Sequence, residues 1–221
     1  MQKWMTALCL TLCAVSCKNN DQDYARVEQK VSSPTVAIIP VYDHSTHRLP
    51  WDVSAELTQS IHHRLLQKEN FLLTQQNKAS SLKKALLANQ NPFAKNVAWM
   101  KNAFPGCDFV VFMELVKHEE ISQTPEKATL EDSSAYLQVA LRVRALDLRG
   151  TSPKVVLQEI VSNRQFLPVK FTKTNFVQVP WGDQFYPISP VGVAHQNLSK
   201  KAADHIADYI SISQSQEHGR E

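Results

Sequence analysis

The sequence predicts a single domain of the α/β class, more closely an α+β mixture, in which a mixed parallel and antiparallel sheet of about five strands is flanked by helices. Hydrophobic residues make up 43% of the 221 residues and charged residues 20%, which is typical of a globular domain with a sizeable core. In the first half, short apolar runs alternate with helical patterns, as they do in parallel βαβ units. The second half contains a long run of alternating apolar and polar residues, which indicates antiparallel strands.

The expected order of elements is βαβααβββα. In chain order, the predicted elements are a strand over 35–41, a helix over 53–68, a strand over 71–74, helices over 80–88 and 91–103, strands over 109–121, 136–149 and 155–161, and a helix over 193–212. Asp52 is expected to cap the first helix, because its side chain can accept a hydrogen bond from an unpaired N–H group of the first turn. A strand, a helix and a strand in succession imply a parallel pair.

The strand over 136–149 alternates cleanly, which predicts an antiparallel strand with one solvated face. Arg142 and Arg144 fall on the solvated face in this pattern. Together with Arg149, they are expected to keep the face soluble by pairing with acids such as Glu159 on the returning strand.

The chain begins with a pattern typical of a lipoprotein signal peptide. Lys3 supplies a positive charge, and residues 4–15 form an apolar run that is shorter than the roughly twenty residues needed to span a bilayer. The sequence AVSC at residues 14–17 follows and resembles the bacterial lipobox, in which leucine is more usual than the first alanine. This resemblance implies cleavage between Ser16 and Cys17 and lipidation of Cys17. The alternatives are an ordinary cleaved signal or a buried N-terminal helix.

The predicted boundaries follow from this interpretation. They are a lipoprotein signal peptide over 1–16, the lipidated cysteine and a flexible polar tether over 17–33, a globular domain over 34–213 and a polar C-terminal tail over 214–221. Lys18 follows Cys17, so the aspartate of the familiar inner-membrane retention signal is absent. The expected location is therefore the bacterial cell envelope, with the outer membrane preferred and the domain facing the periplasm or the surface.

The residue patterns do not indicate an enzyme, a cofactor or a metal site. The 5 glycines leave no phosphate-binding loop, nucleophile elbow or dinucleotide fingerprint. His44 and His47 could contribute to a zinc site, but loop histidines at loose spacing are more often solvated. His118, in an acidic strand end, is interpreted as a solvated edge residue. The net charge of +3 does not favour nucleic acid as a partner.

Residues 176–190, FVQVPWGDQFYPISP, combine aromatic residues with proline. This composition is typical of anchors at protein interfaces. Phe176, Trp181, Phe185 and Tyr186 are therefore candidate contacts with a partner. The alternative is that the segment folds back and covers one end of the sheet.

Several stretches of the chain resemble one superfamily of envelope proteins. The strand VAIIPV, the helix DVSAELTQSIHHRLL and the strand FLLTQQ resemble the opening of the superfamily that includes the curli-secretion lipoprotein and the lipoprotein activators of penicillin-binding proteins. DFVVFMELVKHEE and the hairpin from YLQVALRVRALDLRG into KVVLQEI resemble its later strand and turn, although Met113 stands near a family glycine. The resemblance covers most of residues 34–165 and the last helix, and it extends to chlamydial-type envelope lipoproteins.

The resemblance implies a lipid-anchored, non-enzymatic domain that binds another envelope protein in the periplasm as an adaptor or regulator. It carries no catalytic residues over to this chain. The expected partners are the membrane, through the N-terminal lipid, and another envelope protein, with a homo-oligomer as a further possibility. The alternative function is an oligomeric component of an envelope secretion or transport system.

Overall fold

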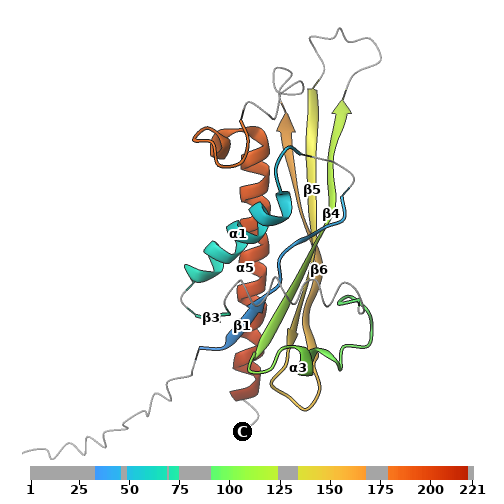
Figure 1. Ribbon diagram of the computed structural model, residues 1–221, viewed down its shortest axis with the longest axis vertical. Coiled ribbons are helices and arrows are strands. Elements are labelled where there is room, and N and C mark those ends of the chain that lie inside the picture. Colours follow the sequence, from blue (N-terminus) through green and yellow to red (C-terminus); the bar gives the residue numbers. More distant parts are fainter. Residues whose placement is uncertain are drawn as a thin grey trace, which may run out of the picture. The chain divides into compact units, whose positions relative to one another are not determined.

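A six-stranded mixed sheet forms the centre of the fold (Figure 1). The computed structural model describes residues 33–45, 49–68, 70–74, 91–123, 134–167 and 179–218. The strands are β1 (Thr35–Ile38), β2 (Tyr42–Asp43), β3 (Leu72–Leu73), β4 (Phe109–Gln123), β5 (Ser134–Asp147) and β6 (Lys154–Leu167). Their order across the sheet is β3-β1-β4-β5-β6, and β2 also pairs with β4. The predicted α+β class and mixed sheet are confirmed.

The parallel part of the sheet contains β1, β2 and β3. β1 is parallel to both β3 and β4, and β2 is parallel to β4. The predicted strand over 35–41 ends earlier, at Ile38, and β2 begins only after Pro40, which has no N–H group to donate to the ladder. The parallel pair predicted for residues 35–41 and 71–74 is confirmed by the register of β1 with β3.

Strands β4, β5 and β6 form the antiparallel part, and each of them is longer than β1, β2 or β3. Their inward side chains join those of α1 (Val53–Leu66) and α5 (Pro190–His218) in the main core. Both helices pack on this one face of the sheet (Figure 1). The side chain of Asp52 accepts a hydrogen bond from Ala55 N at 3.0 Å, as predicted for the cap of α1.

α5 begins earlier and ends later than the predicted helix over 193–212. Its start is fixed by Ser189, whose side chain accepts a hydrogen bond from Gly192 N at 3.0 Å and whose carbonyl accepts one from Val193 N at 2.8 Å. Proline suits the first position of a helix because its missing N–H group would be unpaired there in any case. The predicted helix over 80–88 lies outside the described residues.

The opposite face of the sheet is partly covered by residues 91–104, which include the short helix α3 (Met100–Ala103). The helix predicted over 91–103 is wrong for most of its length. The side chains of Asn91 and Asn96 accept hydrogen bonds from the backbone N–H groups two residues ahead, at 2.8 and 3.2 Å. These local turns compete with the helical hydrogen bonds.

Residues 91–104 also overturn the prediction of a fully solvated face on β5. Arg144 is buried, and its Nη1 donates to the carbonyls of Pro92 and Ala94 at 2.8 and 2.7 Å. Arg142 remains half-exposed and pairs with Glu114 at 3.1 Å. Of the two arginines predicted on the solvated face, Arg144 therefore lies in the interior and Arg142 at the surface.

The two other groups in the predicted pairing have different partners. Arg149 pairs with Asp147, two residues away on the same strand end, at 2.5 Å. Glu159 pairs with His205 of α5. The expected pairing across β5 and β6 is therefore replaced by contacts to β4, to the strand end and to α5.

Candidate functional site

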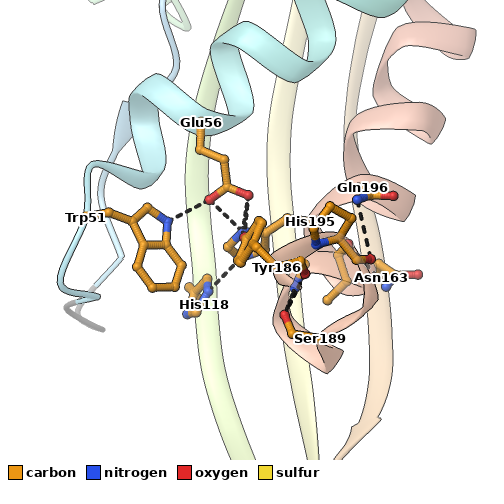
Figure 2. A network of polar contacts seen from close by, with 11 residues as sticks. Trp51, Glu56, His118, Asn163, Tyr186, Ser189, His195 and Gln196 are labelled. Atoms are coloured by element: carbon orange, nitrogen blue, oxygen red, sulfur yellow. Dashed lines mark hydrogen bonds and ion pairs between the residues drawn. The ribbon is translucent and has the colours of Figure 1, made fainter. Parts of the chain in front are cut away.

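Five polar or amphipathic side chains meet inside the main core, where the N-terminal parts of α1 and α5 approach β4 (Figure 2). We call Trp51, Glu56, His118, Tyr186 and His195 the buried network. Glu56, His118, Tyr186 and His195 are 4%, 3%, 5% and 1% exposed. Buried polar groups are costly unless they are hydrogen-bonded, so the geometry of each contact matters here.

Glu56 is the acceptor at the centre of the buried network. It lies in the first turn of α1. Trp51 Nε1 donates to Glu56 Oε2 at 2.8 Å, and the Tyr186 hydroxyl donates to Oε1. His195 Nδ1 lies 2.9 Å from Oε1 and 3.0 Å from Oε2. Through these contacts, the Glu56 carboxylate links three parts of the chain: Trp51 before α1, Tyr186 before α5, and His195 within α5.

Tyr186 opens the short 3-10 helix η1 (Tyr186–Ile188) and packs edge-on against Trp51, with ring centroids 5.5 Å apart. Burial and the adjacent charge of Glu56 raise the pKa of Tyr186 far above its usual value. The phenol therefore stays protonated and serves as a hydrogen-bond donor. Its hydroxyl also lies 2.9 Å from His195 Nδ1.

Gly192 allows η1 to lie directly on the first turn of α5. A Cβ atom at this position would lie 1.9 Å from the Tyr186 carbonyl oxygen, far inside van der Waals contact. The Ser189 hydroxyl in turn donates to the same carbonyl at 2.8 Å. The position of Tyr186 is therefore set by backbone packing as well as by Glu56.

A β-bulge turns His118 into the core. The register of β4 on β5 shifts between Leu115 and Lys117, so that Leu115 pairs with Leu141 and His118 pairs with Val139, and Val116 is the extra residue. If the same residues formed a regular strand without the bulge, alternation from Leu115 would turn Lys117 inward and His118 outward. The prediction that His118 is a solvated edge residue is wrong for this reason.

His118 and His195 face each other through their Nε2 atoms, which are 2.9 Å apart. One of the two nitrogens must carry the proton in this contact, because a hydrogen bond needs one donor and one acceptor. His195 Nδ1 faces the Glu56 carboxylate and therefore carries a proton as well. The arrangement can hold and exchange protons, but its burial keeps it out of reach of a large substrate.

The aromatic residues predicted as partner contacts separate into two groups. Tyr186 is in the core and Trp181 is half-buried against it, as in the alternative that the segment covers one end of the sheet. Phe185 is 56% exposed, and the neighbouring Ile188 is 76% exposed. Phe176 lies outside the described residues, as do Ser16 and Cys17 of the predicted cleavage and lipidation site.

Glu56 and His195 are site residues that the sequence patterns did not predict. His195 lies beside the apolar stripe of a helix, next to Ala194 and one turn before Leu198. Glu56 similarly precedes Leu57 on the buried side of α1. A titratable residue within an apolar helical stripe is the signal that could have identified them.

Of the histidines considered for zinc, His44 lies outside the buried network. Its Nδ1 is 2.8 Å from Glu114 Oε1, and His47 lies outside the described residues. Among the residues that the structure describes, no cluster of three or more histidine, cysteine or acidic side chains is arranged to bind a metal ion.

Residues 22–214 match the model of a family of unknown function, DUF7499. The chain belongs to this family. No curated protein matches the DUF7499 chain. Within its described part, none of the helices combines the length and the apolar character needed to cross a bilayer.

Solved structures show how this DUF7499 fold relates to others. The hypothetical protein CT253 from Chlamydia trachomatis superimposes with a TM-score of 0.64 at 20% identity, over 80% of this chain and 98% of that chain. Lipoprotein GNA1162 from Neisseria meningitidis gives 0.43 at 12% identity, over 66% and 89%. The C-terminal domain of LpoB from Salmonella enterica gives 0.34 at 12% identity, over 62% and 83%. The likeness to CT253 supports the fold.

Proposed function

We propose that the protein is a lipid-anchored lipoprotein of the bacterial envelope that acts without catalysis, as an adaptor or regulator, by binding another envelope protein. The observation that supports binding is a pair of large apolar side chains, Phe185 and Ile188, which are exposed on either side of the buried Tyr186. We call Phe185 and Ile188 the exposed pair. Apolar side chains held at the surface in this way are suited to enter a pocket of a partner.

The buried network supplies the rigidity that such a contact surface needs. The Tyr186 hydroxyl donates a hydrogen bond to Glu56 and lies 2.9 Å from His195 Nδ1. The Phe185 backbone N–H donates to Asp183 Oδ1 at 2.7 Å. A segment that is already ordered loses less conformational entropy when it binds. Burying a side chain of this size contributes about 1.5–3 kcal/mol, so two anchors suffice for a hot spot.

The lipid anchor is supported by the sequence AVSC at residues 14–17 and by the polar residues that follow. A single acyl chain binds a membrane only marginally, whereas two or more hold a protein stably. Lipidation at Cys17 would therefore keep the domain at the membrane surface, where it meets envelope partners. The outer membrane is the location that Lys18 favours.

Site-specific photocrosslinking in the intact bacterial envelope tests the binding surface. A crosslinking amino acid is placed at Phe185 or Ile188, and at Leu66, an exposed apolar position of α1, as the matched control. We expect one envelope protein to be crosslinked from Phe185 and Ile188 but not from Leu66. The same products from all three positions would contradict the proposal, and crosslinks between copies of this chain would instead support an oligomeric component.

The anchor is tested separately by mass spectrometry of the mature N-terminus. We expect an acyl-modified cysteine derived from Cys17 as the first residue, and we expect Cys17→Ser to lose both the modification and the membrane fraction. An unmodified N-terminus in the wild-type protein would refute the lipoprotein assignment.

A further inference from the structure

The contact between His118 and His195 limits the number of protons that the two rings can hold. Two imidazoles have four ring nitrogens, and the 2.9 Å contact between the Nε2 atoms accommodates one proton. The pair can hold two protons as neutral rings, or three with one positive charge, and keep this contact. A fourth proton leaves two donors and two positive charges facing each other, so the contact must break.

The surroundings of the histidine pair favour a limited positive charge. Glu56 of α1 accepts a hydrogen bond from His195 Nδ1, and Tyr186 of η1 stays neutral. In the register of the sheet, His118 pairs with Val139, and Val139 pairs with Asn163, so β5 and β6 contribute uncharged side chains. Charged groups on the packed elements include Glu120, exposed on β4, and Lys201 of α5, whose Nζ lies 3.4 Å from Asn163 Oδ1.

The same contacts hold the segment that carries the exposed pair. His195 Nδ1 lies 2.9 Å from the Tyr186 hydroxyl, and Tyr186 lies between Phe185 and Ile188. Separation of α5 from β4 at the histidine pair therefore displaces the atoms on which Tyr186 rests. The effect would reach Trp51 and Trp181, which pack against the same core.

We propose that the His118–His195 pair is a pH-sensitive device that keeps Tyr186 and residues 179–189 closed against the domain at neutral pH and releases them on acidification. This inference rests on the proposed function, because it describes how presentation of the exposed pair is regulated. Imidazole is the side chain that ordinarily titrates between about pH 5 and pH 8. Acidification would thus weaken binding through Phe185 and Ile188.

The experiment is 19F NMR of the full chain in detergent micelles, labelled with 5-fluorotryptophan and without any partner. Solvent exposure of each indole is read from its H2O/D2O isotope shift between about pH 8 and about pH 5. We expect Trp51 and Trp181 to gain exposure on acidification. Trp99, which packs against the second cluster on the opposite face of the sheet, is the internal control and should not change.

Substitutions of His118 decide the cause. A glutamine amide can either donate to His195 Nε2 or accept from it, so His118→Gln keeps the contact in both protonation states and should abolish the transition. His118→Phe should abolish it as well, and circular dichroism establishes whether that variant is folded. His205→Gln, an exposed histidine of α5, should retain the wild-type transition.

Two results would overturn the proposal. One is an unchanged isotope shift of Trp51 and Trp181 in the wild-type protein at about pH 5, and the other is the same transition in His118→Gln. Because these measurements use no partner, they are separable from the crosslinking test at neutral pH. If crosslinking fails while the transition is observed, the proposed function is lost and the pH response of the segment remains.

Discussion

Removing the hydroxyl of Tyr186 is the most direct test of the buried network. Tyr186→Phe keeps the ring, so the edge-on contact with Trp51 and the buried apolar area are preserved. The variant loses the hydrogen bond that the hydroxyl donates to the Glu56 carboxylate. Glu56 then keeps only the donors of Trp51 and His195.

The expected cost follows from the kind of bond that is lost. A buried hydrogen bond to a charged group stabilises a protein by about 1.5–3 kcal/mol, and we expect about 2 kcal/mol because two donors to the carboxylate remain. In a domain of this size, such a loss lowers the melting temperature by about 4–8 °C. The free energy of unfolding should fall without a change in the slope of its dependence on urea concentration.

Urea unfolding followed by circular dichroism provides the measurement, and Tyr209→Phe is the matched control. Tyr209 is 41% exposed on α5, so removing its hydroxyl should change the unfolding free energy by less than about 0.5 kcal/mol. If the midpoints of Tyr186→Phe and Tyr209→Phe are the same, the tyrosine bond to Glu56 does not hold the segment in place, and the reasoning fails.

Two further predictions concern single contacts. Burial alone would raise the pKa of Asp147, but hydrogen bonds from Arg149 and Ser213 and the charge of Arg149 lower it below 3.8. The ionised carboxylate therefore stabilises the folded state above the unfolded-state pKa. This stabilisation is lost as the pH falls through the folded-state pKa. The difference in urea stability between the wild type and Asp147→Asn should therefore be large at neutral pH and shrink below about pH 4. Gly192→Ala should destabilise the protein in thermal unfolding despite the higher helix propensity of alanine, because its Cβ would overlap the Tyr186 carbonyl. Gly150→Ala is the control and should be close to neutral, because the nearest atom to its Cβ would lie 3.7 Å away.

Most of the fold was predictable because apolar periodicity reports directly on burial. The strand and helix patterns of residues 35–74 and 109–161 predicted the right element types and the parallel start of the sheet. The helix predicted over 91–103 was wrong because the side chains of two asparagines accept hydrogen bonds from backbone N–H groups two residues ahead. These local hydrogen bonds compete with helical ones, and apolar periodicity does not reveal them. Arg144 was misplaced because the segment that buries it comes from far away in the sequence.

The candidate site was much less predictable than the fold. The buried network assembles Glu56, His118, Tyr186 and His195 from four separate elements, and their sequence separation reaches 139 residues for Glu56 and His195. Tyr186 was selected for its aromatic character, but no local pattern indicates that its hydroxyl donates to Glu56 of α1. His118 was assigned to solvent because it stands in an acidic strand end, and no composition signal marks an extra residue in a long strand.

The bulge at Val116 also affects how related sequences should be aligned. Because the bulge places two residues of β4 opposite one residue of β5, Val116 is accommodated without changing the pairing partners of the residues beyond it. A DUF7499 chain that lacks this residue can form a regular ladder and keep its inward histidine aligned with His118, whereas a chain of equal length without a bulge would need that histidine at the position equivalent to Lys117. A gap at Val116 with the histidine in the same column would therefore mark a core that has lost the bulge and kept the contact, and a histidine shifted by one column without a gap would mark the same change in a strand of unchanged length.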